Sequence, residues 1–362
     1  MNRLIFIVTN DLVHDQRMER ICTSLSRAGY PVKLVGRSTR ASLPLLQKPY
    51  QQKRIRVLFS KGKSFYIEFN FKLFFYLLFQ KAALVTAIDL DTILPVYFIS
   101  KIKKIKRAYD AHELFTEMKE VISRPLIHRL WKKVERFAVP RFPNGYTVSD
   151  SISNEFEKEY GVKYLTIRNV PVLEPELNHH LRNKTLIYTG AVNEGRGFEG
   201  LVPAMKTIDT KLYIYGDGNF MEQCRELIDR TQLQEKVILK EKLKPEELKK
   251  VCREAWIGIN LVEPLGKNQI FSLANKFFDY IHADLPQISM NFPEYKRVNE
   301  EYEIAVLVEG VNQEEISESI NRLINDEALY ARLKSNCLRA KKTYNWQEEE
   351  KKLIGFYNRL LP

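Results

Sequence analysis

Two short segments in the second half of the chain have the composition of phosphate-binding turns. Gly190, Gly195 and Gly197 surround Arg196 directly after an apolar run that predicts a strand. Glycines at this place let the backbone approach a phosphate, and the N-terminus of the following helix favours an anion. Arg196 would add a charge-assisted, bidentate hydrogen-bond partner. Spacing alone leaves an ordinary glycine turn equally open.

The second glycine segment follows the next predicted strand. Gly216 and Gly218 stand in Tyr-Gly-Asp-Gly, without the third glycine of a dinucleotide fingerprint, so this segment indicates NAD binding only weakly. The chain also has no GxxxxGK motif, and a Walker-type ATPase is therefore not predicted.

A cluster of residues that ends at Lys276 could hold the same kind of ligand. The cluster contains Ser272, Leu273, Ala274, Asn275 and Lys276. It begins a predicted helix, whose free N–H groups together with Lys276 would suit a diphosphate. Asp279 lies about one turn further on the same helical face, where its carboxylate could accept hydrogen bonds from a ribose diol. The alternative, which spacing alone favours, is a capped helix with a surface Lys276–Asp279 pair.

In the first half of the chain, polar residues follow two predicted strands. His112 and Glu113 come after the strand 107–109 and would face a cleft, although a structural role for the histidine is equally open. An HExxH zinc site is excluded because Thr116 occupies the position of the second histidine.

Asp89 and Asp91 form a DxD pair after the strand 84–88. Two carboxylates alone are a weak indication of a metal site. A helix is predicted to begin at once, so Asp91 or Thr92 could simply be its cap.

The elements that must position these residues alternate between strand and helix in two series. The predicted strands are 4–8, 32–35, 84–88, 107–109, 145–148 and 165–167, then 185–188, 212–215, 237–239, 257–261, 287–290 and 305–308. Such alternation predicts an α/β protein with two doubly wound, Rossmann-like domains that face a central cleft. We expect an N-terminal domain over 1–170, a linker over 171–183 and a C-terminal domain over 184–345. The helix 346–362 is expected to pack back on the first domain.

Composition narrows the class of partner. The chain has 362 residues and a net charge of +12, which favours phosphates, nucleic acid or anionic lipid. No nucleic-acid-binding motif accompanies the charge, so nucleic acid is not an expected partner. The four cysteines show no CxxC spacing, and the cytosol is the simplest compartment. We expect neither a signal peptide nor a membrane-spanning helix.

One surface could nevertheless meet a membrane. Residues 65–79 include eight aromatics, and residues 101–107 include five basic side chains. Together they could lie on an anionic membrane interface. The alternative is a helix that faces the core with its lysine stems lying along apolar surface.

Six motifs, taken in order and spacing, make nearly the whole chain resemble the retaining glycosyltransferases of family four, which have the two-domain GT-B fold. The motifs are Asp15-Gln-Arg17, Asp110-Ala-His-Glu113, Arg168-Asn-Val-Pro171, Gly190 to Gly197, Tyr215-Gly-Asp-Gly218 and Asn275-Lys-Phe-Phe-Asp-Tyr280. The resemblance implies transfer of a sugar, with retention, from a nucleotide-diphosphate sugar to a glycan or lipid-linked acceptor. It implies a role in cell-surface polysaccharide synthesis at the cytoplasmic side of the membrane, without a cofactor.

The resemblance also implies roles for single residues. Arg196 and Lys276 would neutralise the diphosphate leaving group in place of a metal, Asp279 would hold the ribose, and His112 would contact the donor sugar. The other implied donor-binding residues are Gly190, Gly195, Gly216, Gly218, Ser272, Leu273, Ala274 and Asn275. The implied acceptor-side residues are Asn10, Asp15, Arg17, Asp89 and Glu113.

Two departures from the family pattern leave other functions open. Many members have two glutamates eight positions apart; Asp279 fills the second place, but Phe271 stands at the first. The loop 9–11 also lacks the usual pair of glycines. A nucleotide-sugar epimerase of the same fold, with His112 and Glu113 as its proton-transfer groups, is one alternative. A non-catalytic subunit that binds a nucleotide sugar is the other.

Overall fold

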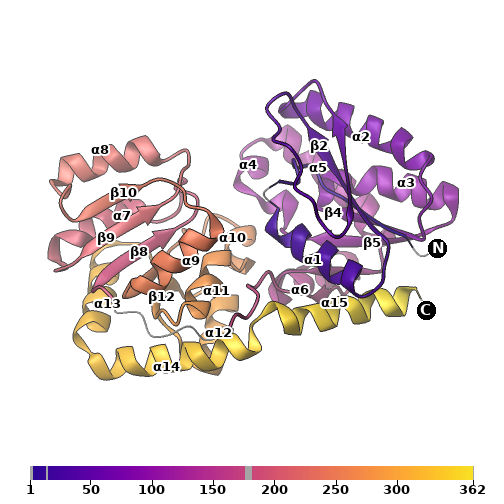
Figure 1. The fold of residues 1–362 in the computed structure, drawn as a ribbon. Helices are drawn as coiled ribbons and strands as arrows, with labels where there is room; N and C mark the ends of the chain where they lie inside the picture. The colour runs from indigo at the N-terminus through magenta and orange to yellow at the C-terminus, as the bar shows by residue number, and fades with distance from the viewer. Residues whose placement is uncertain (1–2, 14, 176–181, 362) are drawn as a thin grey trace. The chain divides into compact units, whose positions relative to one another are not determined.

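The computed structural model describes residues 3–13, 15–175 and 182–361. It divides into two compact units (Figure 1), of which unit 1 is Met1–Asn169 with Glu349–Pro362 and unit 2 is Val170–Glu348. Each unit contains one parallel sheet with helices. The predicted α/β architecture of two doubly wound domains is therefore confirmed.

The sheet of unit 1 has seven parallel strands in the order β3-β2-β1-β4-β5-β6-β7. Its strands are β1 (Leu4–Ile7), β2 (Val32–Ser38), β3 (Gln51–Arg56), β4 (Leu84–Ile88), β5 (Lys106–Ala111), β6 (Gly145–Thr147) and β7 (Leu165–Thr166). The strand order reverses around β1, which pairs with both β2 and β4. At such a switch point the carboxyl ends of neighbouring strands open a crevice for ligands. Polar residues that follow β1, β4 and β5 consequently meet at one edge.

One strand of this sheet was not predicted from the sequence. β3 reads Gln-Gln-Lys-Arg-Ile-Arg, and only Ile55 is buried. It pairs with β2 alone, at the edge of the sheet. Charged side chains protect such edges from pairing with other chains, and the same charges remove the apolar run by which a strand is recognised.

The helices of unit 1 are α1 (Gln16–Arg27), α2 (Gly62–Leu78), α3 (Ile93–Lys103), α4 (Lys119–Ile122), α5 (Pro125–Ala138), α6 (Asp150–Tyr160) and the main part of α15 (Trp346–Leu360). α15 contributes to the core of unit 1 through Tyr357. Its ring centroid lies 5.7 Å from that of Phe6, and its hydroxyl lies 3.0 Å from the hydroxyl of Thr86.

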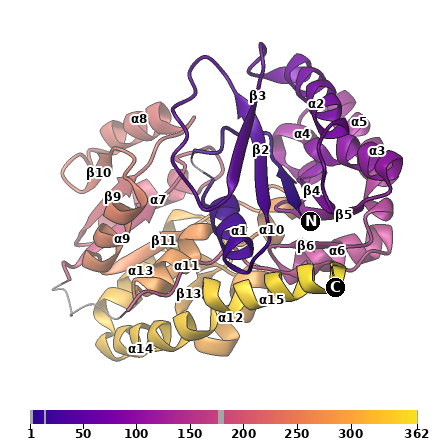
Figure 2. The same ribbon diagram turned by 45° about the vertical axis from the view of Figure 1, so that its right-hand side comes forward.

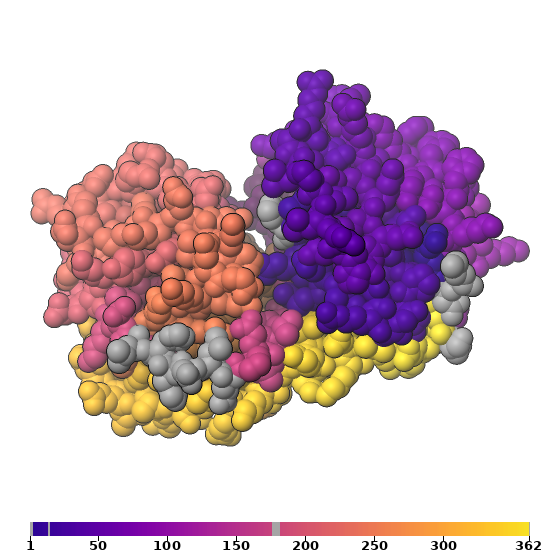
Figure 3. All heavy atoms as spheres, viewed as in Figure 1, coloured from indigo at the N-terminus to yellow at the C-terminus, as the bar shows by residue number. Residues whose placement is uncertain are grey.

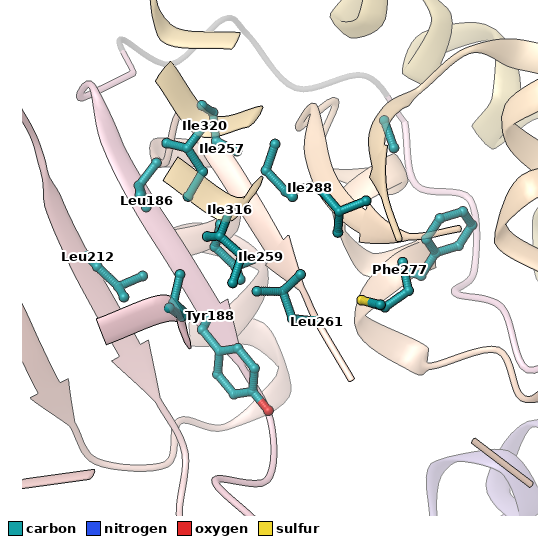
Figure 4. Packing of buried hydrophobic residues seen from close by; sticks show 14 of the residues in the cluster. Leu186, Tyr188, Leu212, Ile257, Ile259, Leu261, Phe277, Ile288, Ile316 and Ile320 are labelled. Atoms are coloured by element: carbon teal, nitrogen blue, oxygen red, sulfur yellow. The ribbon is translucent and has the colours of Figure 1, made fainter. Parts of the chain in front are cut away.

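The sheet of unit 2 has six parallel strands in the order β10-β9-β8-β11-β12-β13. They are β8 (Thr185–Thr189), β9 (Lys211–Tyr215), β10 (Val237–Lys240), β11 (Ile257–Asn260), β12 (Gln287–Met290) and β13 (Ala305–Val308). Buried side chains such as Leu186, Ile259 and Ile288 pack from these strands against Ile316 of the helix α13 (Figure 4). The near-continuous apolar strands match a parallel sheet that is covered on both faces.

The helices of unit 2 are α7 (Phe198–Ala204), α8 (Met221–Thr231), α9 (Pro245–Glu254), α10 (Lys267–Phe271), α11 (Asn275–His282), α12 (Pro293–Tyr302), α13 (Gln313–Asn325) and α14 (Glu327–Thr343). α14 lies on the surface of the unit, in yellow in Figure 3. The short helix α10 was not predicted, and α11 begins at Asn275, inside the cluster that was expected to begin the helix. The intervening Ser272 and Ala274 are extended, with ψ of 160° and 139°.

The predicted membrane-facing segments are only partly exposed. Phe65 and Phe69 are buried in unit 1. Lys103 donates to the Leu78 carbonyl (2.8 Å), and Lys106 donates to the Leu360 carbonyl. No helix in the described ranges is both long enough and apolar enough to cross a membrane.

Candidate functional site

The glycine-rich turn after β8 rests on the loop after β9. The Gly190 N–H donates to the Tyr215 carbonyl (3.0 Å). A Cβ atom at Gly216 would lie 1.8 Å from the Gly190 carbonyl oxygen, and one at Gly218 would lie 2.2 Å from the Val192 carbonyl oxygen. Gly216 and Gly218 are therefore needed for the close approach of the two loops, and they fix the position of the turn.

Glycine is also needed on both sides of Arg196. Gly195 and Gly197 have φ of +79° and +72°, in the left-handed region that side chains disfavour. The Gly195 carbonyl accepts a hydrogen bond from the Glu263 N–H (2.9 Å), which ties the turn to the segment after β11. The backbone around Arg196 is thus held from two sides.

Lys276, in the first turn of α11, is a buried ammonium without a hydrogen-bond partner in the described chain. The residue is 9% exposed, and its Nζ lies 3.4 Å from the centroid of the Tyr188 ring on β8. Burial, followed by the nearby Arg196 guanidinium, lowers the pKa of Lys276 well below its ordinary value. A cation–π contact offsets part of the cost of burying this charge, but an unpaired buried ion still costs on the order of a few kcal/mol.

Arg196 likewise has no ion pair with any acidic residue in the parts of the chain that the structure describes. It acts electrostatically on Lys276, on Tyr188 and on Tyr295 of α12, which places the guanidinium near all three. Two neighbouring cations with no counter-ion form a site that an anion would complete. We call Arg196 and Lys276 the cation pair.

Two other groups of the segment 272–279, which were expected to be free for a ligand, form hydrogen bonds within the protein. The Ala274 N–H is not free, because it donates to the Tyr295 hydroxyl (3.1 Å), and the Ser272 hydroxyl donates to the Gln269 carbonyl (3.1 Å). The alternative of a surface Lys276–Asp279 pair is wrong, since Lys276 is buried and its Nζ forms no hydrogen bond.

The remaining members of that cluster differ in exposure. Leu273 packs against the core, Asn275 is exposed, and Asp279 is half-buried. Asp279 acts electrostatically on the Cys252 thiol of α9.

In unit 1, His112 is the centre of a polar network at the carboxyl edge of the sheet. Its Nε2 lies 3.0 Å from Asp110 Oδ2, its Nδ1 lies 3.6 Å from Asp89 Oδ2, and its backbone N–H donates to Asp89 Oδ1 (2.8 Å). Burial lowers the pKa of His112, but the Asp110 and Asp89 carboxylates outweigh it and raise the pKa to about 9. The imidazole is therefore a cation at neutral pH, with both nitrogens as donors.

Arg17 and Asp110 form the buried base of this network. Arg17 Nη2 lies 3.0 Å from Asp110 Oδ1, and Arg17 Nη1 donates to the Ile167 carbonyl (3.1 Å). Burial raises the pKa of Asp110, but Arg17 and His112 outweigh it and lower the pKa overall. Arg17 is only 5% exposed, and its guanidinium positions Asp110.

Asp89 has an unusual backbone. Its φ of 55° and ψ of 171° lie in a region that is essentially restricted to glycine. Hydrogen bonds from the Asp89 N–H to the Asp110 carbonyl (3.0 Å) and from the His112 N–H hold it there. Burial raises the pKa of Asp89 to about 6. Strain of this kind persists only where the surroundings enforce it, and it concentrates at functional sites.

The DxD pair is divided between two partners. While Asp89 faces His112, Asp91 Oδ2 accepts a hydrogen bond from the Thr9 hydroxyl (2.7 Å), and burial followed by Asp89 raises the pKa of Asp91 to about 7. In the described ranges, no group of three or more His, Cys, Asp or Glu side chains is arranged to hold a metal ion. Thr92 donates its hydroxyl to the Ile88 carbonyl and provides no side-chain cap.

The other predicted acceptor-side residues have mixed roles. Asp15 caps α1 by accepting from the Met18 N–H (2.9 Å), and it also accepts from the exposed Asn10 side chain. Glu113 is half-buried beside the network. The sequence analysis missed Tyr188 and Tyr295, because each stands in an element whose pattern indicates only core packing.

The comparisons relate part of the chain to a known family and the whole chain to a known fold. Residues 171–339 match the model of the glycosyl transferases group 1. Sucrose-phosphate synthase from Thermosynechococcus elongatus superposes with a TM-score of 0.81 at 14% identity over 99% of both chains. Anabaena HepE, solved with UDP and glucose, superposes with a TM-score of 0.74 at 12% identity over 99% of this chain and 100% of HepE.

WaaG, a glycosyltransferase involved in lipopolysaccharide biosynthesis, gives a TM-score of 0.73 at 14% identity over 96% of this chain and 98% of WaaG. A search of the curated proteins found no significant sequence match. At these identities the structural likeness shows the fold, while the family model covers the unit that holds the cation pair. The chain has the GT-B fold, and its residues 171–339 match the model of the group 1 glycosyltransferases.

Proposed function

We propose that this protein is a retaining, metal-independent hexosyltransferase that uses a nucleotide-diphosphate sugar as donor. Its acceptor would be a glycan or a lipid-linked saccharide on the cytoplasmic side of the membrane, in the synthesis of a cell-surface polysaccharide. The observation that carries the proposal is the cation pair of Arg196 and Lys276. Both cations lie in the unit that matches the family, and neither has a counter-ion in the described chain.

The diphosphate accounts for both cations. When the bond between C1 of the sugar and the β-phosphate oxygen breaks, its electron pair leaves with the phosphate, and negative charge grows on the leaving group. Fixed cations aimed at that charge stabilise the transition state more than the ground state. A phosphate would also pair with Lys276, and this would raise its depressed pKa and keep the ammonium protonated.

The sugar itself is assigned to the network of unit 1. The His112 imidazolium has two N–H donors, and neighbouring carboxylates fix its orientation. Its Nδ1–H, 3.6 Å from Asp89, would donate a hydrogen bond to a donor-sugar hydroxyl while Asp110 holds the ring through Nε2. The acceptor hydroxyl would attack C1 from the face that the phosphate leaves, and its proton would pass to the departing phosphate.

Uridine is the first base to test. HepE was solved with UDP, and so was MnaA from S. aureus, which superposes with a TM-score of 0.61 at 14% identity. Asp279 would hold the ribose of the nucleotide. Gly190, Gly195 and the segment 272–275 would line the donor, while Gly216 and Gly218 would keep the turn in place.

Incubation of the full chain with a panel of nucleotide sugars tests the proposal. Transfer to an added saccharide, or slow hydrolysis of the donor, is the expected result, and the anomeric configuration of the product by NMR reports retention. Conversion of the donor to its epimer would instead identify an epimerase. No change with any donor, despite binding, would identify a non-catalytic subunit.

Activity is expected to survive EDTA, because two side-chain cations take the place of a metal at the diphosphate. The measurement is the initial rate before and after chelation. Complete loss of the rate, with recovery on addition of Mg²⁺ or Mn²⁺, would show that the cation pair is not sufficient.

A further inference from the structure

Three neighbouring helices of unit 1 expose an unusual number of large apolar side chains. The exposed residues are Ile67, Phe71, Phe75 and Phe79 on α2 and its C-terminal end, Phe98 and Ile102 on α3, and Leu126, Leu130 and Phe137 on α5. Phe79 is 80% exposed, Leu126 77% and Phe71 64%. We call this surface the three-helix face. Apolar patches of this kind on a soluble unit mark sites of interaction.

The three helices form one continuous surface. α3 packs against both α2 and α5. The Phe98 and Phe137 rings stack with centroids 6.4 Å apart, and Tyr66 of α2 meets Trp131 of α5 with centroids 5.6 Å apart. In both views α2, α3 and α5 lie on the same side of the unit 1 sheet (Figures 1 and 2).

The outward residues of α2 are not needed for the core of unit 1. Phe65, Phe69, Leu73 and Leu77 recur every four residues and are the buried residues of the helix. Ile67, Phe71 and Phe75 repeat at the same spacing on the other side. An ordinary surface helix is polar on that side, so the second apolar stripe needs another explanation.

Two of the three helices that form this face also expose basic side chains. Lys101 of α3 and Arg129, Lys133 and Arg136 of α5 are exposed. On α5 the single acidic residue is Glu135, which is buried and lies 2.9 Å from Lys132. α3 contains no acidic residue.

The acidic residue of α2 does not neutralise this charge. Glu68 of α2 already pairs with Lys72 (2.6 Å) and accepts from the Leu58 and Phe59 N–H groups. The exposed charge on α3 and α5 is therefore positive.

We propose that the three-helix face lies on the surface of an anionic lipid bilayer, with its aromatic and aliphatic side chains in the interface and its basic residues on the headgroups. Aromatic and aliphatic residues beside lysine and arginine are the composition of segments that lie in the membrane interface. The inference is independent of the proposed sugar transfer, because it concerns a surface that holds none of the residues assigned to donor or acceptor.

Vesicle flotation of the full chain tests this assignment. The wild type is expected to float with vesicles of phosphatidylcholine and phosphatidylglycerol at low salt, and much less with phosphatidylcholine alone. Binding should fall as salt rises, because the charge attraction is screened over about 10 Å at 0.1 M ionic strength. Each basic residue near the surface contributes about five-fold to the partition constant.

Two variants separate the apolar and the charged contributions. A triple variant, Ile67→Ser, Phe71→Ser and Phe75→Ser, is expected to lose binding. A quadruple variant, K101Q, R129Q, K133Q and R136Q, should weaken binding at low salt by more than about ten-fold. Circular dichroism melts would establish that both variants are folded.

Each variant has a matched control. K211Q, K240Q, K242Q and K250Q removes four exposed charges from unit 2, and Leu43→Ser with Leu46→Ser removes exposed apolar residues from the 39–50 connection of unit 1. Both controls should bind vesicles like the wild type.

Three outcomes would overturn the assignment. In the first, the wild type does not float with the vesicles. In the second, the folded variants float as well as the wild type. In the third, the wild type does not bind lipid and is a dimer that the triple substitution converts into a monomer. The last outcome would make the face an interface between two copies of the chain. Turnover of a soluble acceptor in the same preparations reports the proposed function separately, so the two proposals can fail independently.

Discussion

The polar clusters of the two units are built on opposite principles. In unit 1, Arg17, Asp110, His112 and Asp89 form a chain in which each charge lies beside an opposite one. In unit 2, Arg196 and Lys276 lie beside each other, and Lys276 has no hydrogen-bond partner in the described chain. In the first cluster every charge is paired within the protein, whereas in the second the charges would be paired only by an anion.

This difference separates preorganisation from binding. A network that already satisfies its charges can hold His112 in one orientation before any ligand arrives. A pair of uncompensated cations raises the free energy of the empty protein, and a bound phosphate would remove that cost. If the cation pair binds phosphate as proposed, unit 2 loses stability in exchange for affinity, and substitutions in the two clusters should behave differently.

The largest expected effect is on turnover. Arg196→Ala and Lys276→Ala should each lower kcat by about 10²–10³, the effect of removing one positioned donor from a site where charge develops. The fold should be unchanged, because neither side chain holds an ion pair in the described chain. Steady-state rates with the best donor of the panel measure the effect, and near-wild-type rates in both variants would place the phosphates elsewhere.

Stability gives the next contrast, between two buried lysines. Lys276→Met should stabilise the ligand-free protein by on the order of 1 kcal/mol, because it replaces an unpaired buried cation with an apolar chain. Lys341, which is 7% exposed and lies 2.7 Å from Asp284, is the matched control. Lys341→Met should destabilise the protein by about 1–3 kcal/mol, since it leaves that carboxylate unpaired.

Urea unfolding of these two variants measures both changes. A loss of stability in Lys276→Met as large as that in Lys341→Met would mean that Lys276 has a partner and that the contrast between the clusters is wrong.

The network of unit 1 predicts a shifted histidine titration. The pKa of His112 is about 9 in the folded protein, above the ordinary value of about 6.5. The resulting stabilisation is therefore complete below about pH 6.5 and is lost as the pH rises through about 9. The chemical shift of the His112 Cε1–H by NMR gives the midpoint, and Asp89→Asn should lower it. A midpoint near 6.5 in the wild type would show that the carboxylates do not act on this ring.

The smallest expected effect is the uptake of a fraction of a proton when the donor binds. Because Lys276 has a depressed pKa, donor binding should be accompanied by proton uptake at a pH above that value. Titration calorimetry in two buffers with different ionisation enthalpies measures the uptake. The same uptake in Lys276→Met would assign the proton to another group.

The sequence predicted more of the fold than of the contacts at the site. Apolar strands such as β1 and β8 are recognisable because parallel strands are buried on both faces, whereas the charged edge strand β3 carries no such pattern. The glycines of the segments 190–197 and 216–218 indicated turns, but the role of each glycine depends on backbone contacts between the two loops. The pairing of Arg17 with Asp110, 93 positions apart, could not follow from any local pattern.

Lys276 illustrates the same limit. Spacing favoured a surface pair with Asp279, and only the packing of α11 against Tyr188 buries its ammonium. The resemblance to a family implied the charge at this position. The tertiary structure supplied the reason that the charge lacks a partner.

The central claim, that the cation pair binds a diphosphate, is tested most directly by comparing nucleoside diphosphates with monophosphates. Calorimetry of UDP and UMP, followed by the guanosine, adenosine and thymidine pairs, should give one base for which the diphosphate binds at least ten-fold more tightly in the wild type. In Lys276→Met and Arg196→Ala that advantage of the second phosphate should largely disappear. Equal affinity for the two nucleotides in the wild type, or an unchanged advantage in both variants, would contradict the account.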